Sequence, residues 1–457
     1  MTEKEFSQAL RRGLGSAIVE LKNSDNKAMY RDIVLRCCLR DISYDWQVEG
    51  TKGFYLYSAI SATGESAYFE RAIVEKFLSR CEDRLFRQLT DILSYCAKDG
   101  STLAKDALHA KYEYFSAKKG RLIKGRIDEG FQWENVACHL FSIDGFSAFK
   151  RYAMDMGELL NRNPDGSNVL YYDWFITEAE DIFGKKRTKK FIDAMYEKSD
   201  AIKSLIDTIK GEELSRKQYQ ENYEKEQVTI EAIVQAAREA AMEESPKYGV
   251  MARLRRPFIK GASDEDVLEL AHIVLREKDE LIKAHLLRMF WRKPFPLGAT
   301  PLIEYALSNN ELLAENAMDC LTELKDKKIH DFALRLLASK EFNASALGLL
   351  KNNYRKTDDN IIFSLIKSSS IPHHFQMDIV DIYTRHRSAN AFSILFRVYQ
   401  RGECTYCRYG IIKAMHHCKV LSDEILAECL HDSYEDTRKL AKRLIKRKQK
   451  QGGRLYG

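Results

Sequence analysis

Proline is scarce in this sequence, with seven residues in a chain of 457. Because proline interrupts helices and marks the turns of loop-rich β folds, its scarcity favours helices. The period-two alternation of apolar and polar residues that is typical of strands is hard to find. No apolar run reaches the length of a membrane span, and the first residues, MTEKEFSQALRRG, hold no apolar signal core. We therefore expect an all-α, soluble, cytoplasmic protein without a membrane segment.

Motifs of the common catalytic classes are missing as well. The chain has no phosphate-binding GxxxxGK[ST] loop, no GxSxG, no HExxH, and no GxGxxG after a strand. The acidic pair Asp358–Asp359 is ordinary for a charged helical protein. The four tryptophans, interpreted as packing residues on helices, are Trp46, Trp133, Trp174 and Trp291. The sequence therefore predicts no catalytic residues, no cofactor and no enzyme.

Charge shows no strong excess of either sign, since the net charge is +6 while charged residues make up 31% of the chain. A small global excess permits an acidic partner but does not require one. The ten cysteines occur without a secretion signal, so we interpret them as reduced thiols that pack as small apolar side chains.

Helical periodicity continues along the chain and becomes repetitive in its C-terminal part. Each repeat there consists of a short apolar helix, a polar break and a second helix with apolar residues at i, i+3, i+4 and i+7. A spacing of about 30 residues is within the range of helical solenoid repeats. The five segments are 300–324, 328–350, 359–383, 390–415 and 423–445.

The predicted organisation is an α-solenoid of helical hairpins in two segments. Residues 213–244 are predicted as one long charged helix, and Pro246, Pro257 and Gly261 as breaks after it. Ser263 is expected to cap the next helix, with Asp266 three residues on. The predicted regions are the N-terminal hairpins at 1–210, the charged helix and linker at 211–262, the C-terminal repeats at 263–448 and a basic tail at 449–457.

Two segments, GECTYCRYGIIKAM and HDSYEDTRKLAKRL, resemble the second helix of HEAT repeats. In that motif a polar turn precedes an arginine, here Arg408 or Arg438, and apolar residues such as Ile412 and Leu444 follow. The chain as a whole is also similar to a family of uncharacterised bacterial HEAT-repeat proteins. The blocks that carry this resemblance include YDWQVEGTKGFYLYSAI, SIDGFSAFKRYAMDMGELL, RMFWRKPFPLG and NNYRKTDD. The resemblance implies an armadillo-type α-solenoid.

The stretch CTYCRYGIIKAMHHC, residues 404–418, has the composition of a metal site. A single helix places Cys404 and Cys407 one turn apart but cannot surround an ion tetrahedrally. A third ligand would come from the next helix, where Cys429, with His431, is the candidate. We interpret the stretch as a repeat helix with buried reduced thiols and no metal, and keep a site made by Cys404, Cys407 and Cys429 as the alternative.

Basic clusters at 117–126, 184–190 and 252–261 are either solvated loops or contacts to phosphate. The candidate partner-binding residues are Arg253, Arg255, Arg256, Lys442, Arg443, Lys446 and Arg447. The leading hypothesis is a non-catalytic scaffold whose concave face, built from the second helices, binds a protein partner. The alternative is a nucleic-acid-binding protein, possibly an enzyme similar to HEAT-like DNA glycosylases, which requires basic residues, an aspartate and flanking aromatics around a groove. The identity of the partner and the oligomeric state stay open.

Overall fold

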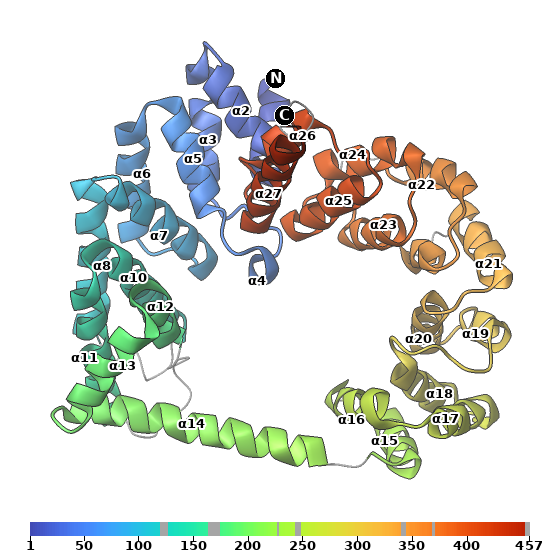
Figure 1. The fold of residues 1–457 in the computed structure, drawn as a ribbon. Coiled ribbons are helices and arrows are strands. Elements are labelled where there is room, and N and C mark those ends of the chain that lie inside the picture. Colours follow the sequence, from blue (N-terminus) through green and yellow to red (C-terminus); the bar gives the residue numbers. More distant parts are fainter. Residues whose placement is uncertain are drawn as a thin grey trace. The chain divides into compact units, whose positions relative to one another are not determined.

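The computed structural model describes residues 1–118, 127–162, 174–225, 228–242, 248–339, 344–367 and 371–452. Over these residues the regular elements are helices, and extended backbone pairs only at an isolated parallel bridge between Ile371 and Gly402 (Figure 1). The all-α prediction is therefore confirmed. In the same residues no helix is both long enough and apolar enough to cross a membrane.

The chain divides into two units. The first comprises Met1–Gln218, Cys404–Tyr406 and Asp423–Gly457, and the second comprises Tyr219–Glu403 and Cys407–Ser422. The division near residue 218 lies inside the region predicted as helix and linker, 211–262. The last helices, which the sequence places with the repeats of 263–448, group with the first unit instead.

The first unit contains the N-terminal helices and the last two helices of the chain. They are α1 (Glu3–Arg12), α2 (Gly15–Asn23), η1 (Lys27–Tyr30), α3 (Arg31–Cys38), α4 (Trp46–Glu49), α5 (Gly53–Thr63), α6 (Ser66–Leu78), α7 (Asp83–Lys98), α8 (Thr102–Ala117), α10 (Ile127–Asp144), α11 (Phe146–Arg162), α12 (Trp174–Phe183), α13 (Lys185–Tyr196), α14 (Asp200–Lys225), α26 (Asp423–Cys429) and α27 (Glu435–Gly452).

Aromatic side chains fill much of the core of the first unit. Phe77 of α6 stacks on Phe86 of α7 with ring centroids 5.0 Å apart, and Trp133 of α10 meets Tyr152 of α11 edge to face at 5.0 Å. All four are at most 1% exposed. Packed aromatic pairs of this kind stabilise a fold beyond the area that they bury.

The last two helices pack on the first ones, which the repeat pattern does not predict. The amide of Ser16 donates to Glu428 Oε1 at 3.1 Å, and the amide of Ser433 donates to the Gly13 carbonyl at 2.9 Å. A Cβ at Gly15 would lie 1.9 Å from the Glu428 carbonyl oxygen, so only glycine allows this approach. The final hairpin therefore packs on the N-terminal helices. The predicted tail also begins inside α27, and its last five residues lie outside the described residues.

The second unit contains the repetitive part of the chain up to residue 422, except Cys404–Tyr406. Its helices are α15 (Ile230–Met242), α16 (Tyr248–Gly261), α17 (Asp264–Arg276), α18 (Glu280–Leu287), η2 (Arg288–Phe290), α19 (Ala299–Tyr305), α20 (Glu311–Thr322), α21 (Lys327–Ala338), η3 (Ala344–Lys351), η4 (Lys356–Asp358), α22 (Asp359–Leu365), α23 (His373–Arg385), η5 (Ala389–Ala391), α24 (Phe392–Arg401) and α25 (Thr405–His417).

The segments with a repeat of about 30 residues each correspond to a pair of helices. The pairs are α19 with α20, α21 with η3, α22 with α23 and α24 with α25. The second members pack on one another in chain order, because α20 contacts α18 on one side and η3 on the other, and η3 contacts α23. In one pair the second helix is a 3₁₀ helix, η3. The expected cap of α17 is confirmed, since Ser263 and Asp266 form a capping box.

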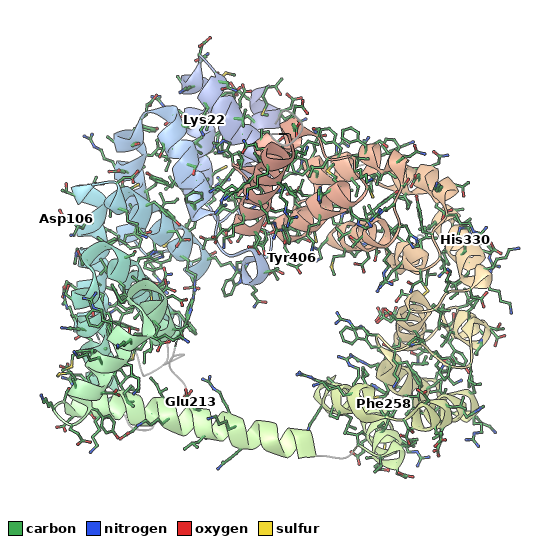
Figure 2. All side chains as sticks on the ribbon, in the orientation of Figure 1. Lys22, Asp106, Glu213, Phe258, His330 and Tyr406 are labelled. Atoms are coloured by element: carbon green, nitrogen blue, oxygen red, sulfur yellow. The ribbon has the colours of Figure 1, made fainter. Side chains whose placement is uncertain are left out.

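The charged segment and linker differ from the sequence prediction in two respects. Residues 213–244 are not one helix, because α14 ends at Lys225 and α15 begins at Ile230. The side chains of α14 from 211 to 218 are nearly all exposed, as Figure 2 shows around Glu213. The predicted break at Pro257 is also wrong, because α16 continues through it to Gly261. A proline inside a helix costs about 3 kcal/mol, and the burial of Met251 and Phe258 offsets this cost. Pro246 lies outside the described residues.

Asp378 on α23 should make the second unit less stable as the pH rises from about 4 to 7. Burial raises the pKa of Asp378 to about 7, and the charge of Asp381 adds to the effect while Lys351 opposes it. The unfolded chain releases this proton near the ordinary pKa of 3.8. The folded state therefore binds the proton of Asp378 more tightly than the unfolded chain does. The stabilisation that results is complete below about pH 4 and is lost by the time the pH has risen through 7. Urea unfolding at several pH values should show a flatter pH dependence for Asp378→Asn. An unchanged slope would contradict the assignment.

Candidate functional site

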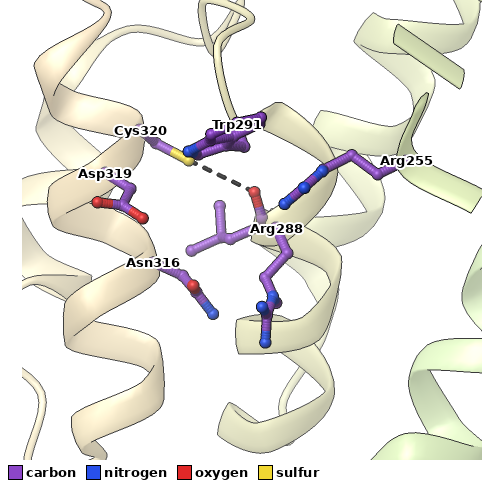
Figure 3. A pocket seen from close by; sticks show the side chains of 7 residues that line it. Arg255, Arg288, Trp291, Asn316, Asp319 and Cys320 are labelled. Atoms are coloured by element: carbon purple, nitrogen blue, oxygen red, sulfur yellow. Dashed lines mark hydrogen bonds between the residues drawn. The ribbon is translucent and has the colours of Figure 1, made fainter. Parts of the chain in front are cut away.

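A pocket of about 270 Å³ lies within the second unit (Figure 3). Its walls come from α16, from the end of α18 with η2 and the turn after it, and from α20. The lining residues are Arg255, Leu287, Arg288, Trp291, Asn316, Asp319 and Cys320.

One wall of the pocket is an exposed indole with cations over it. Trp291 is 36% exposed. The guanidinium of Arg255 lies 4.3 Å from the ring centroid and that of Arg292 lies 4.1 Å from it. Arg292 has a φ of 63°, a left-handed conformation that costs about 1–2 kcal/mol. The turn after η2 is therefore held in an unfavourable conformation that keeps a second cation on the indole.

The facing wall is one side of α20. Asn316, Asp319 and Cys320 are spaced i, i+3 and i+4, so they share a face of the helix. The Asn316 amide donates to the Ala284 carbonyl at 2.9 Å, and the Cys320 thiol donates to the Leu287 carbonyl at 3.5 Å, the dashed line in Figure 3. Carbonyls in the last turn of a helix have no partner within it. These two bonds therefore tie α20 to the end of α18 and fix the width of the pocket.

Asp319 brings an acidic group to this cationic pocket. Its side chain keeps solvent exposure, yet the protein atoms around the carboxylate raise its pKa, and the charge of Glu315 raises it further. Arg288 and Arg255 act in the opposite direction. Guanidinium groups bind carboxylates and phosphates through paired hydrogen bonds and stack on planar groups. The arrangement suits a small group that carries negative charge, with Asp319 able to accept a hydrogen bond from a donor beside that charge.

The structure places only one of the sequence-predicted basic residues in this pocket. Arg255 lines it, whereas Arg253 and Arg256 are exposed elsewhere on α16. Residues 185–190 of the cluster at 184–190 form the start of α13 rather than a loop, and residues 119–126 lie outside the described residues. The predicted residues of the last helix belong to the first unit and are exposed on α27; they are Lys442, Arg443, Lys446 and Arg447.

The stretch 404–418 spans α25, and the two thiols at the start of this helix have a neighbour that the sequence analysis does not identify. Cys404 and Cys407 are grouped with His373, and one ligand atom from each lies within 4.8 Å of the others. Cys429 is buried in α26 and is not a member of this group. The third residue beside Cys404 and Cys407 is therefore His373 of the preceding repeat, and not Cys429 as in the alternative.

The sequence analysis does not identify four residues of the pocket and of the cysteine–histidine group. Trp291 was interpreted as a packing residue but is exposed, as is Trp174 at 48%. Arg288 and Asp319 lie in no recognisable sequence motif. His373 had a usable signal, because it begins the second helix of one repeat just as Cys404 and Cys407 begin that of the next.

Comparisons with known protein families, with curated proteins and with solved structures find no match to this chain.

Proposed function

We propose that this chain is a non-catalytic HEAT-like α-solenoid that binds a protein partner, and that the pocket around Arg255 and Trp291 receives an acidic side chain of that partner. The observation that carries the proposal is the pair of guanidinium groups 4.3 and 4.1 Å from the exposed ring of Trp291. Arginine and tryptophan are the residues most enriched among those that dominate binding energy in protein interfaces.

The size of the pocket supports a side chain as its occupant. About 270 Å³ is smaller than the roughly 300–1,000 Å³ of sites that hold a whole small molecule. A carboxylate that enters it would meet Arg255 and Arg288, and its aliphatic stem would lie on Trp291. The repeated hairpins offer further surface for the rest of the partner.

The acidic groups near the pocket favour a protein over a nucleic acid. Asp319 and Glu315 would repel a chain of phosphates, whereas a single carboxylate can enter between the arginines. A nucleic acid is the second candidate, because Trp291, Arg255 and Asp319 are the residue types that the DNA-glycosylase alternative requires. A base could stack on the indole.

The test is affinity purification of partners with the full chain from the native cell, in nuclease-treated and untreated samples. The partner should survive nuclease treatment, and Arg255→Glu should weaken its binding about tenfold or more because it reverses the charge over Trp291. Arg256→Glu is the matched control, since this neighbour is exposed and outside the pocket. Equal losses in the two variants would show a diffuse charge effect and contradict the pocket. Loss of the partner on nuclease treatment would contradict a protein partner and support the nucleic-acid alternative.

A further inference from the structure

The N-termini of helices α23 and α25 lie side by side in successive repeats of the second unit. The backbone just before them pairs through the parallel bridge between Ile371 and Gly402. His373 is two residues after the first of these and Cys404 is two residues after the second, so the bridge sets them in register. The repeat itself therefore brings a histidine and a cysteine together.

The close approach of the two segments depends on Gly402 and Gln376. A Cβ at position 402 would lie 2.5 Å from Gln376 Oε1 and 2.9 Å from the Val398 carbonyl oxygen. Gln376 is 1% exposed, and its side-chain amide donates to the Ile371 carbonyl at 2.9 Å. A side chain at 402 would therefore force the Gln376 amide group to shift. The bridge sets the register, and the hydrogen bond to Ile371 holds the buried Gln376 side chain in place within its own segment.

Two thiols and an imidazole meet at this point. Cys404 directly precedes α25 and is 1% exposed, and Cys407 is the third residue of that helix and is 4% exposed. The two thiols therefore lie one helical turn apart and face the same side. Cys404 groups with the first unit, but it is bonded to Glu403 of the second unit and precedes Cys407 by three residues, so the chain itself holds it beside Cys407. Cys407 Sγ lies 3.6 Å from His373 Nδ1.

We propose that His373, Cys404 and Cys407 form a zinc site. Thiolate and imidazole donors select zinc over the oxygen-preferring calcium and magnesium. Three protein ligands of this kind leave a fourth tetrahedral position for water or an exogenous ligand. The site does not depend on the pocket at Trp291 or on the proposed partner.

A neighbouring cysteine shows what an ordinary thiol does here. Cys418, at the other end of the same repeat helix, lies 3.5 Å from the Tyr383 carbonyl, to which its S–H donates. A thiol that donates to a carbonyl keeps its proton. Cys407 Sγ lies 3.6 Å from a ring nitrogen, which is a metal donor. Cys418 is therefore the matched control for the metal site.

The experiment uses the full chain, stripped with a chelator, dialysed and reloaded with zinc or with Co²⁺ as a spectroscopic probe. The wild type should bind one equivalent of zinc, and its Co²⁺ form should show a thiolate-to-metal absorption band. Cys407→Ser and His373→Gln should each lose stoichiometric zinc, and Cys418→Ser should retain it. The wild-type melting temperature should rise with zinc, because metal affinity adds to folding free energy.

Three outcomes would overturn the site. One is substoichiometric zinc in the wild type together with a Co²⁺ spectrum that lacks the thiolate band. Another is zinc retained by His373→Gln but lost by Cys429→Ser, which would restore the three-cysteine alternative. The third is unchanged zinc in a folded Cys404→Ser chain, a second thiol variant that is informative even where Cys407→Ser does not fold. Circular dichroism establishes that each variant is folded before its metal content is measured.

Discussion

Replacement of Asp359 by alanine is expected to destabilise the second unit by about 3–5 kcal/mol. The carboxylate is 9% exposed and accepts hydrogen bonds from the hydroxyls of Tyr354 at 2.7 Å, Ser388 at 3.0 Å and Tyr383. Burial raises the pKa of both tyrosines, so their hydroxyls stay protonated and continue to donate. Alanine removes the acceptor shared by all three hydroxyls. A buried hydroxyl without a partner costs about 1–3 kcal/mol.

Native-state hydrogen exchange of peptides from α22 and α23 measures this loss within the second unit. Asp359→Asn keeps one acceptor oxygen and should lose less, and Tyr354→Phe removes one donor and should lose about 1 kcal/mol. Glu269→Ala removes an exposed carboxylate on α17 and should change stability by less than about 0.5 kcal/mol. If Asp359→Ala were as mild as Glu269→Ala, the hydrogen-bond network would not stabilise the unit.

The pair Asp358–Asp359 illustrates what the sequence does not reveal about buried charge. From the sequence the pair is ordinary, yet both carboxylates are buried and hydrogen-bonded. Asp358 lies 3.1 Å from His330 Nε2 and accepts from the Arg355 amide at 2.7 Å. The partners of the pair lie between 3 and 29 residues away in the sequence. Contacts between helices bring the more distant of these partners to two adjacent carboxylates, and periodicity carries no information about such contacts.

The fold class and most helix pairs of the second unit follow from apolar periodicity, because each repeat places its buried side chains at helical spacing. Pro257 does not break α16, since tertiary packing of Phe258 outweighs the local cost of proline. The grouping of α26 with α2 could not be predicted, because it depends on a backbone contact between Gly15 and Glu428. Periodicity reports the environment of a helix and not the identity of its neighbour.

The candidate sites were predictable to different degrees. Arg255 was identified from its basic cluster, but nothing in the cluster separates it from Arg256, which points to solvent. Trp291 was assigned to packing because tryptophan is apolar, whereas it is 36% exposed and precedes the left-handed residue Arg292. His373 could have been found by aligning the starts of the repeats, since His373 and Cys404 hold equivalent positions in them. Residues fixed by the repeat register are therefore more predictable than residues fixed by an irregular turn.

Trp133 holds together the core of the first unit, and its replacement by alanine should cost about 3–5 kcal/mol. The side chain is fully buried, with its ring 5.0 Å from that of Tyr152 and 6.1 Å from that of Tyr112. These residues come from α10, α11 and α8, so the cavity left by alanine would open among three helices. The surrounding backbone is helical and can collapse only in part, which is why the cost should exceed the loss of apolar burial alone.

Urea unfolding should be followed by tryptophan fluorescence in a Trp291→Phe background, in which all remaining indoles belong to the first unit. Trp133→Ala should lower the midpoint strongly, while Trp133→Phe, which keeps an aromatic ring in contact with Tyr152, should lose less than half as much. Trp174→Ala is the matched control, because Trp174 is 48% exposed at the start of α12 and should cost about 1 kcal/mol or less. Equal midpoints for Trp133→Ala and Trp174→Ala would mean that the stability of the first unit does not depend on this aromatic cluster. The difference in their burial requires the two tryptophans to differ several-fold in their effect.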